Sequence, residues 1–137
     1  MSEYTKHLTP RPELRERIIE TAVKAFAAQG IKSITMDDIA TSLGISKRTL
    51  YEVFPDKETL LEECILRGQK EGDEYLKNVL ATSENVLEVL LKCYQRSIEK
   101  FHATNKKFFE DIKKYPKAYK LMTKRHDQDS EETVNFF

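Results

Sequence analysis

The sequence has little of what disulfide-bonded, metal-binding or membrane proteins need. Its two cysteines, Cys64 and Cys93, are far apart within helical patterns, which favours two small buried hydrophobic residues over a disulfide or metal pair. Its three histidines occur singly, without the spacing of a zinc site. No segment approaches the ~20 apolar residues of a membrane-spanning helix, and the N-terminus lacks the apolar core of a signal peptide. We therefore expect a cytoplasmic protein with no metal and no cofactor.

Alternating strand patterns, internal repeats and glycine-rich phosphate loops are missing as well. Apolar residues recur instead at helical spacing, so the sequence predicts an all-α protein. No set of residues resembles a nucleophile with a base and an orienting partner, and the carboxylates are spread along solvated helix faces. We therefore do not expect an enzyme.

Neither sign of charge is in excess. Lys+Arg and Asp+Glu both number 23, which leaves a net charge of zero and no overall basic signal for nucleic acid. Residues 1–57 hold nine Lys/Arg and eight Asp/Glu. Any affinity for DNA must come from a local patch and from its duplication in a dimer, and salt should weaken it.

The clearest motif spans residues 35–54, where two short helices meet at a tight turn. Thr35 and Asp38 are spaced as a capping box at the start of the first helix. Gly44 suits a left-handed helix end, and Ser46 can cap the second helix. The inward positions are apolar: Met36, Ile39, Ala40, Leu43, Leu50, Val53 and Phe54. The pattern predicts a DNA-binding helix-turn-helix.

The second helix of this corner would be the recognition helix. Pro55 ends it, because proline removes a hydrogen-bond donor and disfavours helix in the residue before it. Lys47 and Arg48 lie in its first turn, where recognition helices meet base edges and phosphates, and Thr49 can contact a phosphate or a thymine methyl. Such corners also occur in proteins that never bind DNA. A helical protein-interaction module therefore remains an alternative.

The same stretch resembles a known family. Residues 15–61 are similar to the N-terminal domain of the tetracycline-repressor (TetR) family, in order and without gaps. The family's F-x-x-x-G, T-x-x-x-I-A, G-x-S-x-x-x-L-Y-x-x-F and K-E-x-L patterns fall on Phe26–Gly30, Thr35–Ala40, Gly44–Phe54 and Lys57–Leu60.

The resemblance implies a transcriptional regulator, usually a repressor. Family members typically bind an operator as homodimers and release it when a small molecule enters a pocket in the C-terminal helices. On this basis Tyr51 joins the residues expected to face DNA, and Thr35 and Lys57 are expected to hold phosphates. The full expected DNA-binding set is Thr35, Ser46, Lys47, Arg48, Thr49, Tyr51 and Lys57.

The remaining sequence predicts a second helical region. We expect a three-helix DNA-binding domain at residues 10–56 and an incomplete C-terminal regulatory domain at 57–137. The predicted helices outside the corner are a first at about 12–29, a long fourth from 56 to about 81, a fifth at about 84–102 capped by Ser83, a sixth starting at Thr104 or Asn105, and a seventh from Pro116.

Aromatic residues cluster in this second region. Ordinary core packing explains their helical spacing best, and the lining of a ligand cavity is the alternative. The candidate ligand-binding residues are Phe101, Phe108, Phe109, Tyr115 and Tyr119.

The sequence stops where family members usually have two further helices that form the dimer. We therefore expect either a fragment or truncated gene product, or a chain that dimerises through another surface. Val134, Phe136 and Phe137 are the apolar candidates at its end.

Overall fold

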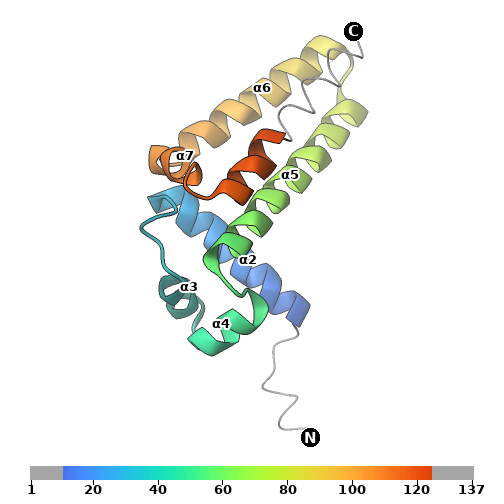
Figure 1. The fold of residues 1–137 in the computed structure, drawn as a ribbon. Helices are drawn as coiled ribbons and strands as arrows, with labels where there is room; N and C mark the ends of the chain where they lie inside the picture. The colour runs from blue at the N-terminus through green and yellow to red at the C-terminus, as the bar shows by residue number, and fades with distance from the viewer. Residues whose placement is uncertain (1–10, 125–137) are drawn as a thin grey trace, which may run out of the picture.

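Residues 11–124 are described by the computed structural model, and every regular element within that range is a helix (Figure 1). The helices are α2 (Arg11–Gln29), α3 (Met36–Leu43), α4 (Lys47–Val53), α5 (Lys57–Thr82), α6 (Val86–Ala103) and α7 (Lys106–Ile112). Residues 116–124 are also helical. The prediction of an all-α protein is confirmed. None of the described helices is long and apolar enough to cross a membrane.

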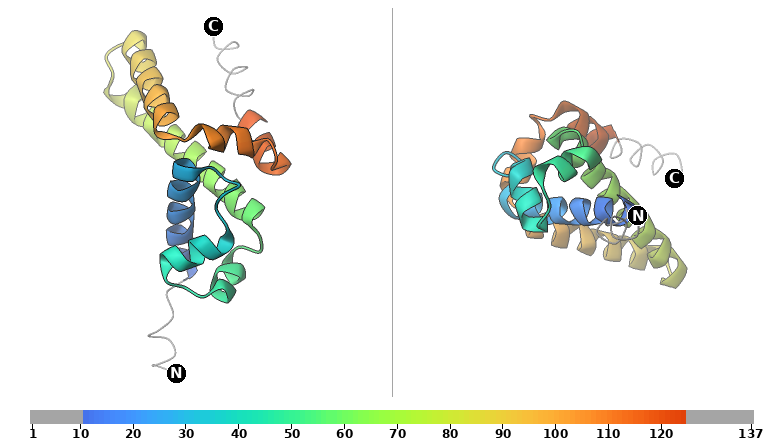
Figure 2. Two further views of the ribbon diagram at one scale, coloured as in Figure 1. Left: turned by 90° about the vertical axis from the view of Figure 1, so that its left-hand side faces the viewer. Right: turned by 90° about the horizontal axis from the view of Figure 1, so that it is seen from below.

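The molecule is elongated. α3 and α4 lie at one end beside α2, while α5 and α6 form an antiparallel hairpin that projects from the other end (Figures 1 and 2). α7 and residues 116–124 pack beside the junction between these two parts. Residues of α2, α3, α4 and the first turns of α5 share one core, to which α7 adds Ile112. The start of α5 thus belongs to the same packed unit as the corner.

Local capping explains where the helices of the corner begin and end. Thr35 Oγ1 accepts from the backbone N–H of Asp38 at 3.1 Å, and Asp38 Oδ2 accepts from that of Thr35 at 2.9 Å, which completes the predicted capping box. Gly44 ends α3 with φ of 68°. Ser46 caps α4 through Thr49, and Asp56 caps α5. The predicted bounds of the corner are confirmed.

One predicted cap is wrong. Ser83 does not begin α6; its backbone N–H bonds to Val79 O at 2.9 Å and closes the end of α5. Asn85 is the cap, and its Oδ1 accepts from the N–H of Glu88 at 2.9 Å. The Glu88 carboxylate in turn accepts from the N–H of Glu84 at 3.0 Å, which fixes the turn ahead of Asn85. At the other end of α6, Asn105 rather than Thr104 caps α7.

α6 carries an apolar side that the described residues leave uncovered. None of its residues is buried. Its exposed apolar side chains are Val86, Leu87, Leu90, Leu91, Tyr94, Ile98 and Phe101. The predicted candidates Val134, Phe136 and Phe137 lie outside the described residues.

Candidate nucleic-acid interface

The corner between α3 and α4 is held by a short set of backbone bonds. The N–H of Gly44 bonds to Thr41 O, and the N–H of Ile45 bonds to Ala40 O, both at 3.1 Å. Ala40 is 3% exposed, so its methyl group lies in the core beneath the turn. Leu50 of α4 is fully buried in the same core, so the opposite side of α4 faces solvent.

That outward side of α4 carries the side chains predicted to face DNA. Lys47 and Arg48 are exposed in the first turn, and Tyr51 is 40% exposed one turn later. Thr49 is half-buried. The free N–H groups and partial positive charge of a helix N-terminus favour phosphate at the same place. The arrangement suits a helix that enters the major groove with its first turn.

The two cations of this turn have different neighbours. Lys47 Nζ lies 3.1 Å from Asp37 Oδ1, and this pairing raises the pKa of Lys47 above its usual value. Arg48 Nε lies 3.4 Å from Glu52 Oε1 within the same helix, with 90% of the Arg48 side chain exposed. A surface pair of this kind contributes little to stability. The Lys47 pair is also at the surface, with side chains 60% and 62% exposed, so either cation can leave its carboxylate for a base or phosphate at low cost.

Ser46 and Thr49 are engaged with each other. The N–H of Thr49 donates to Ser46 Oγ at 3.1 Å, and the two hydroxyl groups lie 2.8 Å apart. Ser46 is nevertheless exposed, as is Thr35, whose hydroxyl oxygen serves the cap of α3. Both hydroxyl groups thus stay at the surface of the corner while they fix the first turns of α3 and α4.

Lys57 is placed differently from the other expected phosphate ligands. It is half-buried, and its Nζ lies 5.7 Å from the ring centroid of Tyr115. Burial lowers the pKa of Lys57, with the nearby carboxylates of Asp111 and Asp38 acting in the opposite direction. Lys57 therefore links the start of α5 to the segment after α7 as well as lying near the corner.

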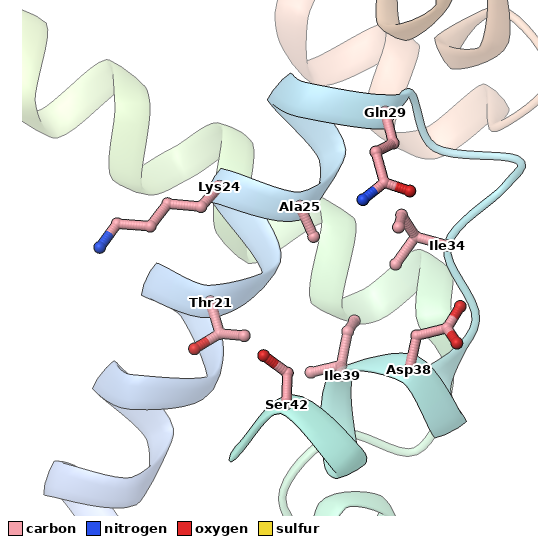
Figure 3. A pocket seen from close by; sticks show the side chains of 8 residues that line it. All are labelled: Thr21, Lys24, Ala25, Gln29, Ile34, Asp38, Ile39 and Ser42. Atoms are coloured by element: carbon pink, nitrogen blue, oxygen red, sulfur yellow. The ribbon is translucent and has the colours of Figure 1, made fainter.

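A groove of about 380 Å³ runs between α2 and α3 beside the corner (Figure 3). Ala25, Ile34 and Ile39 form its apolar part, and Thr21 and Ser42 add hydroxyl groups from facing helices. Its remaining lining residues are Lys24, Gln29 and Asp38, and Lys24 extends away from the groove. The groove mixes both charges and presents no concentrated positive surface.

The end of α2 is joined to the start of α7 by hydrogen bonds between residues far apart in the sequence. The Asn105 N–H donates to Ala27 O at 2.7 Å, and its side-chain Nδ2 donates to Ala28 O at 3.1 Å. These carbonyls belong to the last turn of α2, where helix carbonyls lack partners within the helix. Asn105 thus caps α7 and also closes α2.

Asp111 completes this junction. Its Oδ2 accepts from the backbone N–H of Ile31 at 3.1 Å and of Lys32 at 2.9 Å, in the loop that leads to α3. Gly30 makes the approach possible, because a Cβ there would lie 2.8 Å from Lys107 Cβ. The sequence offered no signal for this role of Asp111, since its partners lie 79 and 80 positions away.

A second, larger pocket of about 580 Å³ opens between α2, α5, α6, α7 and residues 116–124. Three of the five aromatic candidates line it, namely Phe101, Phe108 and Phe109. Phe109 stacks on Phe101 with ring centroids 5.3 Å apart and meets Phe108 edge-on at 5.5 Å. Tyr115 and Tyr119 are not in its lining; Tyr115 packs against the core, and Tyr119 is exposed.

Comparison with known proteins agrees with this geometry. Residues 18–64 match the family model of bacterial regulatory proteins, tetR family. IcaR of Staphylococcus aureus (strain Newman), the negative transcriptional regulator of the biofilm operon icaADBC, is 32% identical over 72 residues, which cover 53% of this chain and 37% of IcaR. The HTH-type transcriptional regulator YhgD of Bacillus subtilis (strain 168) is 32% identical over 101 residues, covering 71% of this chain and 52% of YhgD. The chain thus matches about half or less of the length of these relatives.

Solved structures share the fold. A TetR-family transcriptional regulator from Pectobacterium atrosepticum superimposes with a TM-score of 0.55 at 28% identity, over 65% of this chain and 46% of that one. The ketosteroid transcriptional regulator KstR2 of Mycobacterium tuberculosis gives a TM-score of 0.66 at 22% identity, over 94% of this chain and 67% of that one. The corner and the fold agree with these matches: residues 18–64 match the tetR family of bacterial regulatory proteins, and the described helices share the fold of its solved structures.

Proposed function

We propose that this protein is a sequence-specific DNA-binding transcriptional regulator that represses its target until a small molecule releases it. The observation that carries the proposal is α4, whose buried Leu50 leaves Lys47, Arg48 and Tyr51 on the solvent side. Its relative IcaR is named a negative transcriptional regulator, which supports repression over activation. A protein of this kind works where bacterial DNA lies, in the cytoplasm.

In this proposal each residue of the corner has a defined role. Arg48 and Lys47 contact base edges and phosphates from the first turn of α4, and Thr49 and Tyr51 extend the contact along the helix. Ser46, Thr35 and Lys57 hold the backbone on either side, since phosphate contacts orient a recognition helix without specifying sequence. Arg48 supplies most of the sequence preference, because its guanidinium can pair with guanine through two hydrogen bonds.

We further propose a homodimer with two corners, spaced by about one turn of DNA or a multiple of it. A single corner has few cations, and the whole chain has a net charge of zero, so one half-site would bind weakly. In the proposed division, residues 10–56 form the DNA-binding domain and residues 57–137 form the regulatory region. The long helix α5 joins them, because its first turns pack in the core of the corner.

The effector is proposed to occupy the pocket between α2, α5, α6 and α7. The pocket has the size and the apolar lining typical of small-molecule sites. One of its walls is the end of α2, through Phe26 and Ala27, and α2 packs against α3. A ligand in the pocket therefore contacts the helix that supports the corner.

The test is selection of bound genomic DNA fragments by the purified chain, followed by titration of the recovered site at several salt concentrations. We expect a recurrent sequence bound with an affinity that falls as salt rises. A double substitution, Lys47→Ala with Arg48→Ala, should abolish the preference. The matched control is Lys70→Ala with Lys77→Ala, which removes the same charge from an exposed part of α5. This control variant should retain the sequence preference. Enrichment of no sequence, with salt-independent binding, would contradict the proposal and favour a protein-interaction module.

A further inference from the structure

The pocket between α2, α5, α6 and α7 has an apolar floor built from distant parts of the chain. Phe26 comes from α2, Ile65 from α5, Phe101 from α6, Phe108 and Phe109 from α7, and Met122 from the helical residues 116–124. Aromatic rings and a flexible methionine suit a ligand with an aliphatic or aromatic body. The volume of about 580 Å³ accommodates an organic molecule of moderate size.

The charged groups of the pocket all have one sign. Arg96 and Lys100, one helical turn apart on α6, line it, and no acidic side chain does so in the described part of the chain. The guanidinium of Arg96 lies 4.8 Å from the ring centroid of Tyr75. On the facing helix, Gly72 lies beside this guanidinium, since a Cβ there would be in ordinary contact with an Arg96 nitrogen at 3.8 Å. The cations therefore stand at the edge of an apolar surface.

The other polar groups that line the pocket leave this positive balance unchanged. Ser97 Oγ donates to Cys93 O at 3.0 Å, Thr104 Oγ1 donates to Lys100 O at 2.8 Å, and Gln69 Nε2 donates to Leu121 O at 3.2 Å. Burial raises the pKa of the Cys64 thiol to about 12, so this group stays protonated and adds no negative charge at neutral pH. A positively charged ligand would meet only like charges.

We propose that the ligand of this pocket is an amphipathic organic carboxylate. Its apolar body contacts the apolar floor of the pocket, and its carboxylate binds Arg96 and Lys100. That this ligand acts as an effector rests on the proposed function, which the assignment deepens by naming the chemical class of the effector. An ammonium ligand with the same body is disfavoured by both cations, and a neutral alcohol gains only the apolar contact.

The pocket also has a direct route to the corner. Thr104 lines it, and the next residue, Asn105, donates to the carbonyl oxygens of Ala27 and Ala28 at the end of α2. Ala27 lines the pocket as well. A ligand that moves the turn between α6 and α7 therefore strains the bonds that hold the end of α2. Occupancy should lower the affinity for DNA through this turn.

The experiment compares three probes of equal chain length: decanoate, decanol and decyltrimethylammonium. The two ionic probes are kept below their micelle concentrations, and decanol is kept below its solubility limit. Binding to the full chain is followed by calorimetry and by NMR shifts of the Gln69 side-chain amide and of Thr104, which separates the pocket from the exposed side of α6. We expect decanoate to bind about tenfold more tightly than decanol, with the ammonium weakest. Equal affinity of decanoate and decanol, or tighter binding of the ammonium, would overturn the proposal.

Variants locate the carboxylate. Arg96→Gln and Lys100→Gln should each weaken decanoate severalfold and leave decanol unchanged, while Lys106→Gln, an exposed cation outside the pocket, should change neither. Circular dichroism checks that each variant is folded. The assignment would be refuted if Lys106→Gln lost decanoate binding. It would also be refuted if Arg96→Gln and Lys100→Gln both bound decanoate like the parent. Because these measurements contain no DNA, failure of operator binding in a separate titration would reject the proposed function alone.

Discussion

Lys47 at the start of the recognition helix is paired with Asp37 at the start of the preceding helix, at 3.1 Å. Asp37 lies on the side of the corner that carries the proposed DNA-facing cations, where its charge opposes phosphate. We therefore predict that Asp37→Asn raises affinity for the recovered operator by up to about fivefold at low salt, the equivalent of ~1 kcal/mol. Fluorescence anisotropy with labelled operator measures the change.

The control for this prediction is Glu99→Gln, which removes one negative charge from an exposed position on α6, away from the corner. It should change operator affinity far less than Asp37→Asn. The gain should also shrink as salt rises, since screening weakens exposed charge interactions. Equal gains from both substitutions would mean that net charge, and not release of Lys47, sets the affinity.

Arg48 and Lys47 should differ in what they contribute. Arg48→Ala should cost ~1–3 kcal/mol of binding and relax the preference at one base pair, because a guanidinium reads guanine through two hydrogen bonds. Lys47→Ala should weaken all sequences by a similar factor and reduce the salt dependence. Titration of both variants against the operator and single-base variants separates the two roles. Unchanged affinity and preference in both would reject this assignment.

Helix ends in the corner were predictable because their signals are local. Thr35, Asp38, Gly44 and Ser46 act within three or four positions of themselves, and the structure uses each as the sequence indicates. The choice of cap for α6 failed for a related reason. Two good capping residues, Ser83 and Asn85, stand close together. The bond from the Glu84 N–H to the Glu88 carboxylate and the bond from the Glu88 N–H to Asn85 Oδ1 decide between them.

Contacts across the fold could not be predicted in this way. Asp111 meets Ile31 only because α7 folds back onto the end of α2, and no periodicity in the sequence reports that approach. The pair of Lys47 with Asp37 likewise depends on the angle at which α3 and α4 cross. The DNA-contacting residues themselves remain predictions, since each rests on its place in the corner.

Ala40 tests the packing of that crossing. Its side chain is 3% exposed, in one core with Ile39 and Leu50. Ala40→Leu adds three carbons where there is no room and should lower the free energy of unfolding by ~1–3 kcal/mol. Urea denaturation measures this loss. The exposed neighbour Thr41→Leu is the control, and it should change stability much less. A variant that unfolds and binds DNA like the parent would show that the helices cross elsewhere.

Acid should weaken the fold through two helix caps. The backbone N–H of Thr35 holds the pKa of Asp38 below its usual value, and the N–H of Thr59 does the same for Asp56. Because both pKa values are lower in the folded chain than in the unfolded one, the stabilisation is complete above about pH 4 and is lost as the pH falls further. Thermal unfolding across this range measures the decline.

The matched variant for this acid dependence is Asp38→Asn with Asp56→Asn, in which amides keep the hydrogen-bond acceptors and lose the charge. It should be less stable than the parent at neutral pH and should lose less stability on acidification. An identical slope in parent and variant below about pH 4 would show that other carboxylates govern the acid response.

Gly30 and Gly44 share a left-handed backbone, with φ of 85° and 68°, but differ in their surroundings. A Cβ at Gly30 would lie 2.8 Å from Lys107 Cβ and 3.0 Å from Asp111 Oδ2, whereas a Cβ at Gly44 meets nothing within 4 Å. Gly44→Ala should therefore cost only the ~1–2 kcal/mol of the backbone conformation. Gly30→Ala should cost ~1–3 kcal/mol more, because α7 must move away from α2. Urea denaturation of both variants gives the difference in unfolding free energy that is due to the contact with Lys107. Equal losses would show that α7 moves aside at no cost and does not support the end of α2.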